Sequence, residues 1–154
     1  MNSNITTRSS TKIVKKLFKD KEIIVTEIGV LGGKNTFDML CELNISEFYA
    51  IDPYVVFDDI SSQISQKYNK LNSAKERAII RLKGFKNVNH IYKNSSDAID
   101  EVPISDFIYI DGNHNYKFVK QDLNNYFNKV KIGGVFAGHD INKKEGVTKA
   151  VLNL

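Results

Sequence analysis

The sequence is poor in the features that would place it outside the cell or in a membrane. It has one cysteine, Cys41, and a lone thiol cannot form a disulfide within its own chain. A reducing compartment is the default for such a chain. The N-terminal stretch MNSNITTRSS is polar and lacks the apolar core of a signal peptide. The apolar runs are as short as strands and cannot cross a bilayer. We therefore expect a cytoplasmic protein with no membrane partner.

Nothing in the sequence divides the chain. It has no internal repeat and no linker rich in proline or serine, and 154 residues is a length typical of one domain. We expect residues 1–10 to be a disordered tail and residues 11–154 to form one domain. The net charge of +4 is mild, and the lysines are spread among acids rather than clustered with aromatic residues. This pattern favours a solvated surface over a nucleic-acid site.

Hydrophobic periodicity predicts helices that alternate with five short strands. The expected strands are EIIVTEI, EFYAID, VNHIY, DFIYID and GVFAGHD, with KIGG as a turn before the last. The expected helices are STKIVKKLFKD, NTFDMLCEL, residues 60–82, SSDAIDEV, YKFVKQDLNNYFNKV and EGVTKAVLNL. In NTFDMLCEL we expect Phe37, Leu40 and Cys41 to face the core. The alternation predicts an α/β fold, a doubly wound, Rossmann-like and mostly parallel sheet with helices on both faces.

Acidic or metal-competent residues end three of the five expected strands. Asp52 ends the second strand, Asp111 ends the fourth, and His139 and Asp140 end the fifth. In an open parallel sheet, ligands bind at the carboxyl ends of the strands, near the point where the strand order reverses. The sequence therefore predicts a ligand site at this edge.

The turn after the first strand, VTEIGVLGGKNTF, indicates the kind of ligand. Gly29, Gly32 and Gly33 do not have the G-x-G-x-x-G spacing of a dinucleotide site, and Glu27 adds negative charge beside the turn. A ligand with an ammonium group and no phosphate fits better, and S-adenosylmethionine is such a ligand. At the end of the next strand, Asp52 is placed to accept hydrogen bonds from ribose hydroxyls.

Four segments together resemble a class I S-adenosylmethionine-dependent methyltransferase. They are VTEIGVLGGKNT, YAIDPY, DFIYIDGNHNYKFVKQDL and KIGGVFAGHDI, and the resemblance covers roughly residues 20–150. They are most similar to small-molecule and sugar O-methyltransferases whose fourth strand ends in D-G-x-H-x-Y and whose fifth ends in G-H-D. The resemblance implies transfer of a methyl group to a hydroxyl of a sugar or small metabolite.

The resemblance also implies roles for individual residues. The cofactor would contact residues at four strand ends: Glu27, Gly29, Gly32, Gly33, Asp52, Ser95, Ser96, Asp97 and Asp111. Among these, Asp52 would hold the ribose, and Ser95 to Asp97 would contact the adenine. Asp111 would lie beside the methionine moiety and the reacting methyl group.

Metal-dependent members of the resembled group imply a further site. Asp111, His139 and Asp140 match the positions that hold Mg²⁺ against the substrate's hydroxyl oxygens. His139 is a departure, because these members more often carry an oxygen ligand there; Mg²⁺ prefers oxygen, while imidazole suits Mn²⁺, Fe²⁺ or Zn²⁺. His114 follows Asp111 by three residues, and its ordinary pKa near 6.5 suits a general base.

Each assignment has a simpler structural alternative. The glycines could serve a tight turn alone. Asp52 could cap a helix, and His139 with Asp140 could cap the last helix. Asp111 could begin a plain turn, and His114 could bond to backbone. His90 and Cys41 are interpreted as structural.

The fold expected from the resemblance has two further strands beyond the fifth. GVFAGHD would be an uncovered apolar edge without them, so the chain could be a truncated domain, a naturally minimal domain or a subunit whose partner covers that edge, and we expect a homodimer. Two other functions stay open, a non-catalytic cofactor-binding scaffold and a nicotinamide-dependent oxidoreductase. The glycine spacing and Glu27 disfavour the oxidoreductase.

Overall fold

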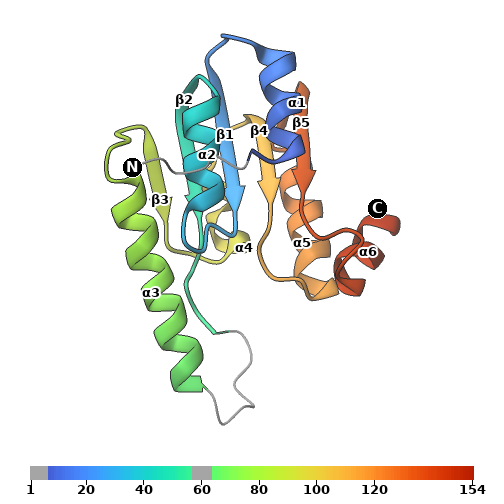
Figure 1. Ribbon diagram of the computed structural model, residues 1–154. Coiled ribbons are helices and arrows are strands. Elements are labelled where there is room, and N and C mark those ends of the chain that lie inside the picture. The colour runs from blue at the N-terminus through green and yellow to red at the C-terminus, as the bar shows by residue number, and fades with distance from the viewer. Residues whose placement is uncertain (1–6, 57–63) are drawn as a thin grey trace.

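The computed structural model describes residues 7–56 and 64–154. Its strands are β1 (Ile23–Ile28), β2 (Ile45–Ile51), β3 (Val88–Ile91), β4 (Ser105–Ile110) and β5 (Val130–Gly138). Its helices are α1 (Ser9–Phe18), α2 (Lys34–Glu42), α3 (Ile64–Leu82), α4 (Ser95–Ala98), α5 (Tyr116–Phe127) and α6 (Glu145–Leu152), with a 3-10 turn at Ile99–Glu101. Strands and helices alternate along the chain, which confirms the predicted pattern (Figure 1).

The five strands form one sheet in the order β3-β2-β1-β4-β5, and each neighbouring pair is parallel. The chain builds outward from β1 to β3, then returns to β4 on the other side of β1. The strand order therefore reverses between β1 and β4, where the open sheet leaves a crevice at its carboxyl edge. This confirms the doubly wound fold.

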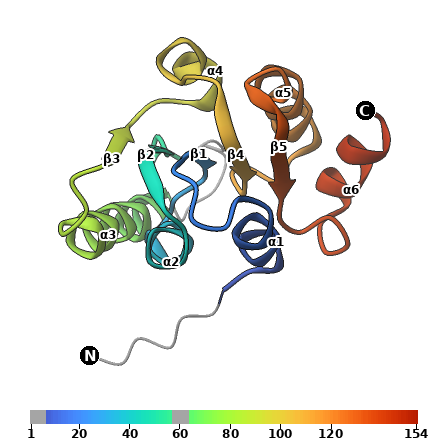
Figure 2. The ribbon, with the colours of Figure 1, turned by 90° about the horizontal axis from the view of Figure 1, so that it is seen from above.

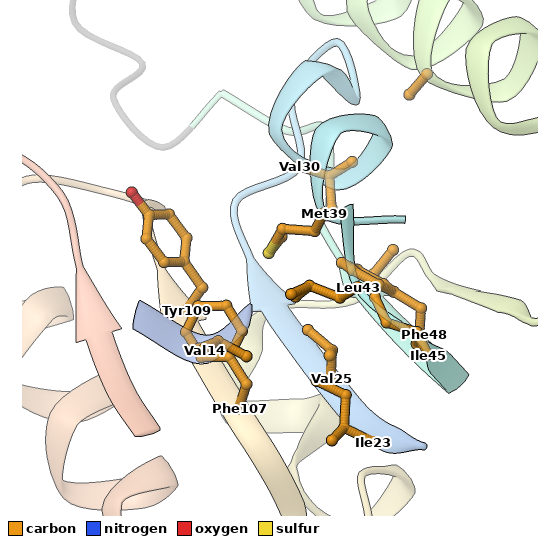
Figure 3. Packing of buried hydrophobic residues seen from close by; sticks show 12 residues of the cluster. Val14, Ile23, Val25, Val30, Met39, Leu43, Ile45, Phe48, Phe107 and Tyr109 are labelled. Carbon is orange, nitrogen blue, oxygen red and sulfur yellow. The ribbon is translucent and has the colours of Figure 1, made fainter. Parts of the chain in front are cut away.

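Helices cover both faces of the sheet. Helices α1, α2 and α3 lie on one face, and α4 and α5 lie on the other (Figure 2). Two clusters of buried apolar side chains fill the layers. One joins α1, α2 and α3 to the sheet through Val14, Met39 and Ala78 (Figure 3). The other joins α4, α5 and α6 to it through Ala98, Tyr126 and Val147. These layers hold the strands so that their carboxyl ends meet at one edge.

Two boundaries differ from the expectations, and two further predicted segments lie partly outside the described residues. Helix α1 begins at Ser9, inside the predicted tail, and residues 1–6 of that tail lie outside the described residues. Residues 60–63 of the predicted long helix also lie outside them. The predicted turn KIGG belongs to β5, where Gly133 has φ +81° and the register with β4 shifts. Both signs indicate a bulge within the strand rather than a turn before it.

The prediction that Cys41 faces the core is wrong, because this residue is exposed. Helix α2 turns the face with Thr36 and Met39 toward the core, and both are fully buried. Phe37 lies on the flank, edge-to-face with Phe85, their ring centroids 5.8 Å apart. The core therefore takes a face rotated by about one residue from the one that apolar periodicity predicted, which leaves Cys41 outside.

Of the helices that the structure describes, none is both long enough and apolar enough to cross a membrane.

Candidate functional site

The ladder of the sheet continues one residue past the ends of four strands. The backbone N–H groups of Asp52, Gly29, Asp111 and His139 each donate to the last carbonyl of the adjoining strand, at 3.1, 2.9, 2.7 and 3.1 Å. These bonds place the four residues in a row along the carboxyl edge. Residues that are far apart in the sequence thus meet at the predicted ligand edge.

A cavity of about 730 Å³ opens at this edge. Eight of the predicted site residues line it: Glu27, Gly29, Gly32, Asp52, Ser95, Ser96, Asp111 and His114. Four others stand outside the described lining. Gly33 is the N-cap residue just before α2 and packs against α3, Asp97 is exposed on α4, and His139 and Asp140 lie beyond Asp111 after the end of β5.

The first glycine turn brings two strands into close backbone contact. Gly29 has φ +89°, a conformation that favours glycine. A Cβ at Gly29 would overlap the carbonyl group of Asp111 and would lie 2.6 Å from the nitrogen of Gly112. Glycine is therefore required here for packing, and the same contact brings β1 and β4 together under the cavity.

Glu27 is a buried carboxyl group in the wall of the cavity. Asn35 Nδ2 donates to its Oε1 at 2.8 Å, and Thr36 Oγ1 donates to its Oε2. Burial raises the pKa of Glu27 to about 7, although these hydrogen bonds oppose the rise. The carboxyl group is thus poised to gain or lose a proton near neutral pH, and a cationic ligand would favour its ionised form.

Asp52 braces the loops around the cavity. Its Oδ2 accepts from the backbone N–H of Leu31 at 2.8 Å, and its Oδ1 accepts from that of Tyr54 at 2.9 Å. Burial raises the pKa of Asp52, and the backbone hydrogen bonds oppose this. Residues 52–56 are not helical, so Asp52 does not cap a helix at these positions. A carboxylate has about four acceptor sites, so the backbone hydrogen bonds from Leu31, Tyr54 and Val30 leave capacity for a ligand hydroxyl.

Asp111, His139 and Asp140 form the kind of cluster that can hold a metal ion. One ligand atom from each lies within 4.8 Å of the others. His139 Nδ1 is 2.9 Å from Asp140 Oδ1 and 3.7 Å from Asp111 Oδ1. Burial would raise the pKa of Asp140, but His139, His114 and Lys143 outweigh it and lower the pKa. Two carboxylates and an imidazole are a donor set that fits a divalent cation such as Mn²⁺.

His114 lies beside this cluster on the loop after β4. Its Nε2 is 3.3 Å from Asp140 Oδ2 and 3.7 Å from Asp111 Oδ1. The Nε2 atom is buried and makes no hydrogen bond within the described part of the chain. A buried nitrogen without a hydrogen bond is costly unless it is charged beside these carboxylates or meets a ligand.

Among the cavity-lining residues that sequence reasoning missed, two carry a charge and are at least partly buried, Arg8 and Asp122. Arg8 donates to Asp111 Oδ2 at 2.9 Å and to the hydroxyl of Tyr109, and its guanidinium lies 5.1 Å from the centre of that ring. Asp122 reaches the cavity from α5. Arg8 lies in a stretch predicted to be a tail, and Asp122 lies in an amphipathic helix. Neither carried a sequence signal of burial.

The sequence of residues 26–141 matches the family described as a methyltransferase domain. A search of curated proteins gives no significant match.

Several solved structures share the fold. A precorrin-6y C5,15-methyltransferase from Geobacter metallireducens is 15% identical, with TM-score 0.66 over 99% of this chain and 72% of its own. An rRNA methylase from Streptococcus thermophilus is 17% identical, with TM-score 0.65 over 100% of this chain and 82% of its own. The O-methyltransferase TomG from Streptomyces achromogenes, solved in complex with SAM, is 13% identical, with TM-score 0.62 over 94% and 63%.

At these identities the likeness shows the fold alone. The chain is also shorter than several of these proteins, since it spans 63% of TomG and 59% of a precorrin 8W decarboxylase of Methanobacterium thermoautotrophicum.

Proposed function

Because the chain belongs to the family of methyltransferase domains, we propose that it is an S-adenosylmethionine-dependent O-methyltransferase. The acceptor is a hydroxyl of a sugar or another small metabolite, and residues 11–154 form the cofactor-binding domain. One observation carries the proposal. Glu27, Asp52 and Asp111 come from the tips of three neighbouring strands, and all three line one cavity.

The charges of this cavity suit a cationic nucleoside better than a dinucleotide. Glu27 and Asp111 line the space beside the glycine turn, and the ionised form of Glu27 would repel a pyrophosphate there, while Arg8 offsets the charge of Asp111. The ammonium group of a methionine moiety would be attracted there, with the ribose at Asp52. TomG, which shares the fold, was solved with SAM, and this supports the same cofactor here.

Transfer requires little covalent chemistry from the protein. The sulfonium supplies an electrophilic methyl group; its C–S bond breaks as the acceptor oxygen bonds to the carbon, and the electron pair stays on sulfur. His114 takes the acceptor's proton at Nε2, the buried atom that lacks a hydrogen bond among the described residues. Asp111, His139 and Asp140 are the residues that would hold Mg²⁺ or Mn²⁺. Such an ion lowers the pKa of a bound hydroxyl.

Two further properties belong to the same proposal. We place the protein in the cytoplasm. We also propose a homodimer in which a second copy covers β5, because β5 ends the described sheet and Ile132 on it is fully exposed.

Calorimetric titration with S-adenosylmethionine, S-adenosylhomocysteine and NAD tests the cofactor. We expect both sulfur ligands to bind and NAD not to bind. Asp52→Asn should weaken binding by about tenfold, because the ribose loses a charged acceptor. Asp100→Asn is the control, since Asp100 is exposed in the 3-10 turn and should leave binding unchanged. Binding of NAD in preference to the sulfur ligands would contradict the proposal.

Turnover is tested separately by release of S-adenosylhomocysteine with nucleotide sugars, catechols and short RNAs, each with Mg²⁺ or Mn²⁺. Methylation of a sugar or catechol supports the proposed acceptor class. Methylation of RNA instead would support methyl transfer but contradict the proposed class of acceptor. Cofactor binding without turnover on any acceptor would favour the scaffold alternative.

A further inference from the structure

Asp122 is a buried acid that the proposed chemistry does not use. Its residue is 4% exposed, yet it lines the cavity from the second turn of α5. Burial raises its pKa to about 6, opposed by one side-chain hydrogen bond. Burying a carboxyl group costs free energy unless hydrogen bonds or an opposite charge compensate for the lost water. The position of Asp122 at the cavity wall therefore suggests that a ligand supplies part of this compensation.

The two oxygens of Asp122 have different surroundings. Oδ1 accepts a hydrogen bond from Ser95 Oγ, at the start of α4. Oδ2 lies toward Gly112, another lining residue, since a Cβ placed on Gly112 would be 3.8 Å from it. Tyr126 also holds the start of α4, because its hydroxyl donates to the carbonyl of Ser95 at 2.7 Å. One oxygen is thus anchored to α4, and the other lies beside Gly112, a residue of the cavity lining.

Asp122 and the start of α4 lie at the end of the cavity that the base of a bound nucleoside would reach. Asp52 marks the ribose position in the proposed function, and its N–H donates to Ile91, the last residue of β3. The chain after β3 leads directly to Ser95. Asp97, which sequence reasoning placed at the base, is exposed and stands outside the described cavity lining.

We infer that Asp122, rather than Asp97, selects the base of the nucleoside ligand. Its carboxylate accepts a hydrogen bond from an exocyclic amino group, so the cavity takes adenine in preference to a base with a carbonyl at that position. An ionised carboxylate has only acceptor sites, so it pairs with the N6 amino group of adenine and repels the O6 of hypoxanthine. This inference rests on the proposed function.

The test compares S-adenosylhomocysteine with S-inosylhomocysteine by calorimetry at pH 8, where Asp122 is ionised. We expect the native protein to prefer the adenosyl ligand by at least about tenfold. In Asp122→Asn this preference should fall to within about threefold, because the amide can donate to O6. The asparagine oxygen still accepts from Ser95, so a merely structural role would leave the ratio unchanged. Asp97→Asn is the matched control, and this variant should keep the native preference for the adenosyl ligand.

The outcomes separate the two proposals. If neither nucleoside binds the native protein, the proposed function fails. If both bind the native protein equally, or if Asp122→Asn keeps the native ratio, base selection by Asp122 is overturned while cofactor binding stands. A loss of selectivity in Asp97→Asn alone would return the role to Asp97.

Discussion

At the scale of single residues, Arg8 changes how the predicted metal cluster is understood. Its guanidinium is paired with Asp111 Oδ2, the carboxylate that the metal hypothesis shares with the cofactor hypothesis. A fixed cation at this carboxylate supplies positive charge without a metal ion. It also opposes a second cation at Asp111, because like charges repel strongly where water is partly excluded.

Removing Arg8 should therefore strengthen metal binding. We expect Arg8→Gln to bind Mn²⁺ about tenfold more tightly than the native protein, a difference of about 1.4 kcal/mol. Calorimetric titration of Mn²⁺ into both proteins measures this. Lys16→Gln, which removes an exposed charge from α1, the helix that follows Arg8, should have no effect. An unchanged affinity in Arg8→Gln would show that the ion pair does not compete with the metal.

At the scale of elements, the turn between β1 and α2 holds the site together. Glycine spacing indicated a ligand at this turn, and a tight turn alone was the alternative. The structure gives Gly29 a packing role, since it brings the backbone of β1 against that of β4. The two interpretations are compatible, because the contact that needs glycine also places Glu27 and Asp111 in one cavity.

Gly29→Ala should destabilise the fold by about 3 kcal/mol or more, since the new Cβ would overlap the backbone of Asp111 and φ would stay positive. Urea denaturation followed by circular dichroism measures the change. Gly84→Ala provides the control, because no atom lies within 4 Å of a Cβ there, and we expect a change within about 0.5 kcal/mol. Equal stability of the two variants would rule out the close contact.

At the scale of the whole molecule, the cavity places buried acids where they affect stability. Burial raises the pKa of Glu27, Asp52 and Asp122 above their ordinary values. Each group therefore binds its proton more tightly in the folded than in the unfolded protein. The stabilisation is fully present below the unfolded pKa, and it is lost as pH rises through the folded pKa.

The native protein should accordingly lose stability, relative to Glu27→Gln, between about pH 4.5 and pH 8. The pKa of Glu27 rises from 4.5 to about 7, so the difference should approach about 3 kcal/mol. Urea denaturation of both proteins across this range measures it. The result would be contradicted by parallel stability curves, which would mean that Glu27 titrates normally in the folded state.

The sequence by itself determined the alternation of strands and helices, and it placed Asp52 and Asp111 at strand ends. Apolar periodicity and strand boundaries are local properties, so they can be read without the fold. The parallel sheet then brings those ends together, because parallel strands share one carboxyl edge.

Only the tertiary structure decided which other side chains join them. Arg8 meets Asp111 across 103 residues, and Asp122 enters the cavity because α5 packs beside α4. Likewise Cys41 faces outward because α2 packs on the sheet through the face that carries Thr36 and Met39 rather than through the neighbouring face that carries Cys41. Such choices depend on the fit between distant elements, and no local pattern in the chain encodes that fit.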